Sequence, residues 1–127
     1  MNKILVLFVL MYICHYLADF VFQGQIALYK QRKWWRDNYN KKMYKNDWLI
    51  SLFIHSINWT LAILLPGLLM GLLTNPIIFI ILFILNTLFH AYIDHLKCNM
   101  LCINLVRDQL YHMLQIIISF FIIIFLN

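Results

Sequence analysis

The chain has 127 residues, of which 64% are hydrophobic and only 12% are charged, with a net charge of +5. An ordinary soluble domain is about half apolar and about a quarter charged, and a domain this small has too little interior to bury so much apolar surface. The composition therefore excludes a soluble globular protein and predicts one integral membrane domain over residues 1–127.

The first hydrophobic stretch, residues 3–23, has the length of a membrane-spanning helix. A secretory signal peptide is the competing interpretation, but no Ala-x-Ala cleavage site follows the stretch. We therefore expect a retained transmembrane helix. His15, Asp19 and Gln23 are spaced four residues apart, so they form one polar stripe along it.

Residues 24–46 are basic and rich in aromatic side chains. Aromatic residues among basic ones are typical of single-stranded nucleic acid binding, but next to a membrane span they indicate a segment at the level of the lipid headgroups. We favour the second interpretation, with anionic headgroups as partners and no nucleic acid. The residues expected at the membrane surface are Lys30, Arg32, Lys33, Trp34, Trp35 and Arg36.

Three further hydrophobic stretches cover residues 48–73, 76–97 and 107–126, and each is long enough to cross a bilayer. The predicted fold is therefore all-α, a four-helix transmembrane bundle with a basic and aromatic first loop. Every one of these spans also carries polar residues on one face: His55 on the second, His90, Asp94 and Lys97 on the third, and Asp108 and His112 on the fourth.

The distribution of basic residues predicts the orientation in the membrane. Lysine and arginine concentrate in the first and third loops, whereas the opposite side of the predicted bundle has only Lys3. Because basic loops stay in the cytoplasm, we expect these loops inside and both termini outside. The chain is expected to cross the membrane four times.

The same orientation places the four histidines of the spans at one depth. Each lies five to eight residues from the cytoplasmic end of its span, which corresponds to about 7–12 Å at a rise of 1.5 Å per residue. On three helices an aspartate lies one turn closer to the cytoplasm. Lipid cannot satisfy such groups, so all four stripes should face the interior of the bundle.

Imidazole and carboxylate groups gathered in this way are ligands for zinc, manganese or iron. One histidine in a span is usually a packing residue, but four at matched depths favour a metal or proton-handling centre over inert polar contacts. Seven ligands exceed one tetrahedral shell, so either two ions bind, or one binds and a spare aspartate (Asp19, Asp94 or Asp108) acts as a general base. The predicted ligands are His15, Asp19, His55, His90, Asp94, Asp108 and His112, with Gln23, Lys97 and Gln109 around them.

The motifs at these positions resemble a family of small bacterial and phage membrane proteins of unknown function. The matching patterns are His-x-x-x-Asp-Phe-x-x-Gln at residues 15–23, His-x-x-x-Asp-x-x-Lys at residues 90–97 and Asp-Gln-x-x-His at residues 108–112. The resemblance extends over nearly the whole chain and implies a polytopic inner-membrane protein, with no established activity. The pattern is also loosely similar to membrane proteins described as metal-dependent hydrolases.

These observations predict a membrane-embedded, metal-dependent hydrolase that acts on a lipid or a phosphate-bearing amphiphile at the cytoplasmic leaflet. Two other classes of protein stay open. Aspartate and histidine chains also form proton or metal-ion pathways, although the outer halves of the spans offer almost no ionisable lining. A non-catalytic membrane accessory protein would use the polar cluster only to fix the bundle. The sequence is compatible with an oligomer.

Overall fold

The computed structural model describes residues 2–39 and 42–126, so Asn40 and Lys41 of the basic loop lie outside the described residues, as do Met1 and Asn127. All regular secondary structure within the described residues is helical, and these residues form no strand. The predicted all-α class is therefore confirmed. In chain order the elements are α1 (Lys3–Tyr16), the π turn η1 (Leu17–Val21), α2 (Ile26–Tyr29), α3 (Arg32–Asn38), the 3-10 turn η2 (Lys42–Tyr44), α4 (Asp47–Leu69), α5 (Pro76–Cys98) and α6 (Leu105–Leu126).

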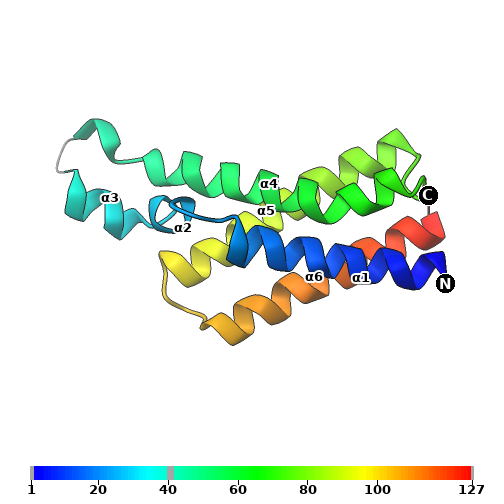
Figure 1. The fold of residues 1–127 in the computed structure, drawn as a ribbon. Coiled ribbons are helices and arrows are strands. Elements are labelled where there is room, and N and C mark those ends of the chain that lie inside the picture. Colours follow the sequence, from blue (N-terminus) through cyan, green and yellow to red (C-terminus); the bar gives the residue numbers. More distant parts are fainter. Residues whose placement is uncertain (1, 40–41, 127) are drawn as a thin grey trace.

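Four of these described helices, α1 with η1, α4, α5 and α6, are long and apolar enough to cross a membrane. They run alternately up and down, and each packs against its two neighbours in the order α1, α4, α5, α6 and back to α1. Both termini lie at one end of the bundle, which we call the terminal end (Figure 1). Residues 22–39, 42–46 and 99–104 lie at the other end, which we call the loop end.

The turn between α4 and α5 is longer than the predicted spans suggest, because α4 ends at Leu69 rather than at residue 73. Gly71 has a positive φ of 64°, which glycine adopts without a steric cost, and so reverses the chain after α4. The Asn75 side chain then caps α5 by accepting a hydrogen bond from the Ile77 amide at 3.0 Å. Pro76 occupies the first turn of α5, where its missing amide hydrogen costs nothing.

The bundle is apolar outside and polar inside, the reverse of a water-soluble protein. Leu5, Leu69 and Phe125 are 58%, 78% and 73% exposed on its surface. Among the described residues, buried polar and charged side chains outnumber buried hydrophobic ones. A bilayer is the solvent in which such an arrangement is stable, because lipid solvates the apolar surface and the polar groups satisfy one another inside.

An apolar core fills the terminal half of the bundle. Its members come from all four long helices and the α4–α5 turn: Leu7, Met11, Trp59, Ile63, Leu64, Leu73, Leu82, Ile116 and Ile123. The absence of a side chain at Gly67 allows this close packing, because a Cβ atom there would lie 3.2 Å from Leu73 Cβ and 3.4 Å from Ile123 Cδ1. The core holds the helices in register and so fixes the heights of the polar residues below it.

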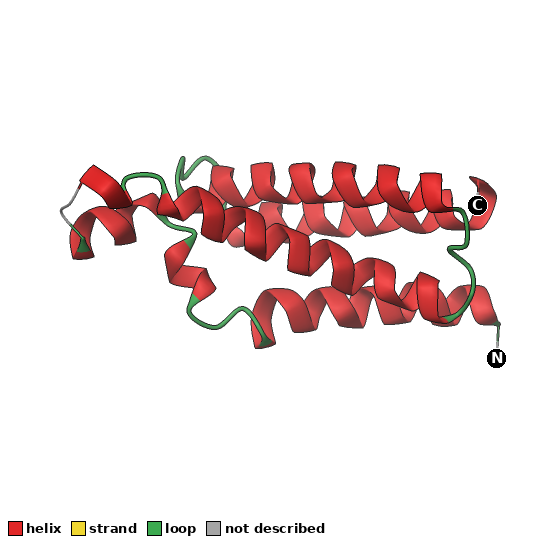
Figure 2. Ribbon diagram, turned by 90° about the horizontal axis from the view of Figure 1, so that it is seen from above, coloured by secondary structure: helices red, strands yellow, loops and turns green. Residues whose placement is uncertain are grey.

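The first loop folds on itself at the loop end. The rings of its aromatic residues contact one another, and Trp35 Nε1 donates a hydrogen bond to the Tyr29 carbonyl oxygen at 2.6 Å. Helix α3 extends past the ends of α1, α5 and α6, beside the start of α4 (Figures 1 and 2). The predicted contact of Arg32, Lys33, Trp34, Trp35 and Arg36 with anionic headgroups stays a prediction.

A hydrogen-bonded ladder joins α5 to α6 in the middle of the bundle. Asn86 Nδ2 donates to Ser119 Oγ at 2.8 Å, and Gln115 Nε2 donates to the Asn86 carbonyl oxygen at 3.2 Å. The three side chains are buried, so removal of the Asn86 side chain leaves Ser119 without this partner in an apolar environment, while Gln115 keeps the Asn86 backbone oxygen.

We predict that Asn86→Leu lowers the free energy of unfolding by about 1 kcal/mol, the usual size of an interhelical hydrogen-bond contribution in a membrane protein. Unfolding of the purified protein in mixed detergent micelles measures the change. The matched control is Ile84→Ala, two residues away and half exposed on the outer face, which should have little effect. Equal stability of Asn86→Leu and wild type would contradict a structural role for the ladder.

Candidate metal centre

The four long helices place imidazole and carboxylate groups at one level near the loop end. His90, Asp108 and His112 are 0% exposed and Asp94 is 1% exposed. The predicted convergence of the polar stripes is therefore confirmed. The residues come from α1 with η1 (His15 and Asp19), α4 (His55), α5 (His90 and Asp94) and α6 (Asp108 and His112).

An aromatic stack forms one wall of the cluster. The rings of His90 and His112 lie 4.1 Å apart between centroids, with an angle of 26° between their planes. Trp59 packs against both rings, with its centroid 4.2 Å from that of His90 and 5.5 Å from that of His112. Its indole Nε1 donates a hydrogen bond to His15 Nδ1 at 2.8 Å. The stack fixes the two imidazoles as rigid, oriented donors, which is what a metal site requires.

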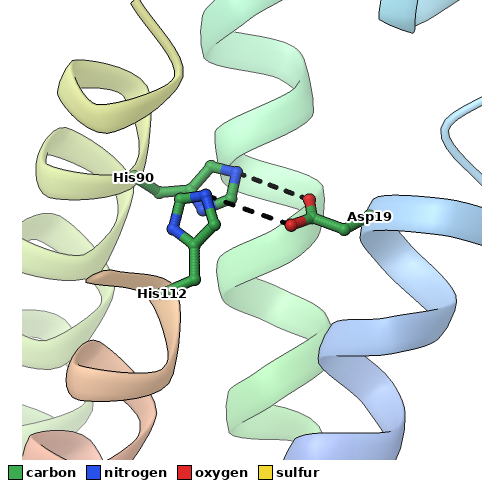
Figure 3. Close-up of side chains that lie close together, drawn as sticks. All are labelled: Asp19, His90 and His112. Carbon is green, nitrogen blue, oxygen red and sulfur yellow. Dashed lines mark ion pairs between the residues drawn. The ribbon is translucent and has the colours of Figure 1, made fainter. Parts of the chain in front are cut away.

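Asp19 faces this stack from η1 (Figure 3). Its Oδ1 lies 3.8 Å from His90 Nε2, and its Oδ2 lies 4.0 Å from His112 Nε2. These separations are too long for hydrogen bonds. Two ligands bound to one ion at 2.0–2.2 Å are about 3.3–3.6 Å apart in tetrahedral geometry, so the spacing is close to that of metal ligands.

Each of the three aspartates is held by a donor on one oxygen and leaves the other free. In all three the held atom is Oδ2, and Oδ1 has no hydrogen-bond partner. Such outer hydrogen bonds orient the ligands of metal sites. The donors are Lys30 to Asp94 at 2.5 Å, Lys97 and Gln109 to Asp108, and Gln109 to Asp19 at 3.5 Å.

Buried polar atoms without a hydrogen-bond partner are rare and costly, and here they gather in one place. The other unpartnered side-chain atom among the described residues is Nδ1 of His95, whose ring stacks on Trp48 at 5.3 Å. The atoms in the cluster are Asp19 Oδ1, both ring nitrogens of His90, Asp94 Oδ1, Asp108 Oδ1 and His112 Nε2.

These residues fall into three overlapping sets whose ligand atoms lie within 4.8 Å of one another. A divalent cation would satisfy the free aspartate oxygens and the Nε2 atoms of His90 and His112, so the donor set fits a metal ion. The identity of the ion is not fixed by oxygen and nitrogen ligands alone. The sets are Asp19, His90 and His112; His55, His90 and Asp94; and Asp94, Asp108 and His112.

Neighbouring amides hydrogen-bond to two of the imidazoles. Gln115 Oε1 accepts a hydrogen bond from His112 Nδ1 at 3.2 Å, so Nε2 is the ring nitrogen of His112 that faces the cluster. Gln23 Nε2 donates to His55 Nε2 at 3.0 Å. Gln23 thus lies beside a predicted ligand, as the sequence analysis expected.

The structure places His15 outside the ligand sets, contrary to its prediction as a ligand. Both of its ring nitrogens are occupied: Nδ1 accepts from Trp59, and Nε2 donates to Gln109 Oε1 at 3.1 Å. Gln109 in turn donates to Asp19 and Asp108. His15 therefore orients the ligands through Gln109, and the helical spacing that places it beside Asp19 could not distinguish the two roles.

Lys30 is the second correction, because it is buried in the centre rather than at the membrane surface. Its side chain is 3% exposed, and its ammonium group forms an ion pair with Asp94. Asn99, at the end of α5, fixes the backbone here by donating to the Lys30 carbonyl oxygen at 3.0 Å and accepting from the Arg32 amide at 2.6 Å. Lys97 forms ion pairs with Asp108 and Asp94 and so lies beside predicted ligands, as the sequence analysis expected.

Two residues beside the cluster were not assigned to it by sequence reasoning. Trp59 lies one turn after His55, and Gln115 lies three residues after His112, so both occupy the polar faces that the spacing identifies. The periodicity could have found them. Lys30 had no such signal, because its burial depends on how the first loop returns to α5.

Comparisons of the chain with protein-family models, with curated proteins and with solved structures gave no match in any of the three. The resemblance to a family of small bacterial and phage membrane proteins therefore stays a prediction from the motifs. The chemistry of the centre has to be argued from its own residues.

We predict that Lys30→Met destabilises the metal-free protein by about 3–5 kcal/mol, because removal of one partner leaves Asp94 as an uncompensated buried charge. Unfolding in detergent with a chelator present measures the loss. Lys33→Met removes the same charge from an exposed position of the same loop and should leave stability nearly unchanged. Equal effects of the two substitutions would contradict the buried ion pair.

Proposed function

We propose that the protein is a membrane-embedded, metal-dependent hydrolase that acts on a lipid or phosphate-bearing amphiphile at the cytoplasmic leaflet. The observation that carries the proposal is the set of unpartnered, buried aspartate oxygens and histidine nitrogens that four helices bring to one level. Structural packing alone would leave these atoms unsatisfied. Zinc, manganese and iron are the ions that this donor set suits.

A divalent ion held by such ligands supplies a water molecule that ionises near neutral pH and a Lewis acid for the substrate oxygen. Hydrolysis bonds the water oxygen to phosphorus or to an acyl carbon, breaks the bond to the leaving oxygen and returns a proton to it. A carboxylate oxygen that does not bind an ion would accept and return the protons, and the candidates for this role are Asp19, Asp94 and Asp108. Lys30 and Lys97, paired to Asp94 and Asp108, lie where their charge attracts a phosphate.

The shape of the bundle supports an amphiphilic substrate. A cavity of about 410 Å³ lies between α1 and α6, with a mainly apolar lining. His15 and Gln109 belong to this lining and also hydrogen-bond to each other beside Asp19 and Asp108. A lipid chain in the cavity would therefore meet the polar centre at its inner wall, without passing through water.

The test is turnover by purified protein in detergent with manganese or zinc, on phospholipid and lipid-phosphate substrates. We predict hydrolysis that requires the metal and falls by at least about 100-fold in Asp94→Asn, the loss expected when a catalytic proton-transfer group is removed. His95→Ala is the matched control, because this ring stacks on Trp48 outside the ligand sets. No turnover dependent on both metal and Asp94 would refute the hydrolase.

The proposal includes the orientation derived from charge, with the basic loops in the cytoplasm and both termini outside. It also includes the bacterial inner membrane that the resemblance implies. We predict that Lys33→Cys, in a background with Cys14, Cys98 and Cys102 replaced by serine, reacts with an impermeant maleimide only after the cells are opened. Thr74→Cys in the opposite turn should react in intact cells. The reverse pattern would refute the orientation.

A second candidate function is proton or metal-ion transport, which the hydrogen-bonded ladder favours. From His112 the contacts continue through Gln115 to Asn86 and Ser119, away from the loop end. Beyond Ser119 the apolar core closes the bundle, which weighs against conduction by a single chain. Ion flux into proteoliposomes, absent in the hydrolase proposal, separates the two functions.

A further inference from the structure

We infer that the centre binds two divalent cations, bridged by the carboxylates of Asp19 and Asp94, and not a single ion. The inference rests on the proposed metal centre. It specifies how many ions the centre binds and which class of substrate it takes. Four observations carry it: the stacking of two imidazoles, the position of two carboxylates against the stack, the placement of two outer ligands, and the balance of charge.

The stacked imidazoles suit two ions better than one. His90 and His112 come from neighbouring helices, and their rings lie nearly parallel at 4.1 Å. The Nε2 atoms of both rings face Asp19, one toward each carboxylate oxygen, whereas ligands of one ion converge on it from different directions. The ions of known two-metal sites lie about 3.5–4 Å apart, which matches the distance between the two rings.

Two carboxylates span the stack, each with one oxygen opposite each ring. Figure 3 shows this for Asp19, whose two contacts run side by side, one to His90 and one to His112. Asp94 repeats the arrangement: Oδ2 lies 3.7 Å from His90 Nε2, and Oδ1 lies 3.8 Å from His112 Nε2. A carboxylate with one oxygen directed to each of two ligand sets is placed to bridge two ions.

The remaining ligands divide evenly between the two positions. His55 Nε2 lies 3.2 Å from Asp19 Oδ1 and 3.4 Å from Asp94 Oδ2, on the His90 side. Asp108 Oδ1 lies 3.4 Å from Nε2 of His112. Each ion would thus have four protein donors: His55, His90, Asp19 and Asp94 for the first, and His112, Asp108, Asp19 and Asp94 for the second. Binding of the first ion exchanges the Gln23 hydrogen bond for a ligand bond.

The charges around the two positions identify the substrate class. A carboxylate oxygen has two lone pairs, so Asp94 can keep Lys30 on Oδ2 while that oxygen binds an ion. Three carboxylates then face two ammonium groups and two divalent ions, which leaves a net positive charge in a buried site. A phosphate monoester, which brings two negative charges, balances this excess better than a neutral ester does. The inferred substrate class is therefore an amphiphile with a terminal phosphate.

The experiment loads the full-length protein in detergent with Mn²⁺ and counts bound ions by mass spectrometry after gel filtration. We expect about two ions per wild-type chain and a magnetically coupled pair in the electron paramagnetic resonance spectrum, as ions bridged at about 3.5–4 Å require. His55→Ala and Asp108→Ala should each keep one ion and lose the coupling. Asp94→Ala should lose both ions, and His95→Ala should keep both.

The possible outcomes separate this inference from the proposed function. One uncoupled ion in the wild-type chain overturns the two-ion centre and leaves a single-ion hydrolase. Two uncoupled ions overturn the carboxylate bridges. No bound manganese, zinc or iron overturns both the inference and the proposed function. Circular dichroism and elution volume check the fold, and His55→Gln and Asp108→Asn replace an alanine variant that does not fold.

Discussion

The absence of water from the hydrocarbon interior is the constraint on which the rest of the structure depends. An ionisable group there has no solvent to stabilise it, so it must find partners inside the bundle. That requirement turns the polar face of every long helix inward and leaves the apolar faces to lipid. His90, Asp94, Asp108 and His112 are consequently among the most buried residues of the protein, positions that leucine or valine would occupy in a soluble bundle of this size.

The two halves of the bundle have different compositions and different structural roles. The terminal half is a dry apolar core in which Gly67 allows close approach of the helices, and this half sets their register. The loop half holds the polar cluster, where hydrogen bonds from lysine and glutamine side chains orient the aspartates. Preorganised ligands of this kind need little rearrangement when they bind a cation. The arrangement is therefore more consistent with a site for binding than with polar packing alone.

The helices and the level of the cluster could be predicted from the sequence, because both follow from local periodicity and from the cost of burying charge in lipid. His15 and His90 show where this reasoning stops. Both lie on inward faces at the same depth, yet Trp59 and Gln109 occupy the nitrogens of one, and no side chain occupies those of the other. Burial of Lys30 was equally hidden, since it depends on Asn99, which lies 69 residues further along the chain. Such differences are tertiary, and spacing along one helix does not encode them.

The position of Lys30 gives the first loop a part in the chemistry of a centre that the helices build. Its ammonium group contributes one positive charge directly at Asp94, and the hydrogen bonds to Asn99 hold that charge in place. A rearrangement of the loop would change the electrostatic potential at the ligands without moving any transmembrane helix. A segment outside the four long helices thus contributes directly to the electrostatics of the buried cluster.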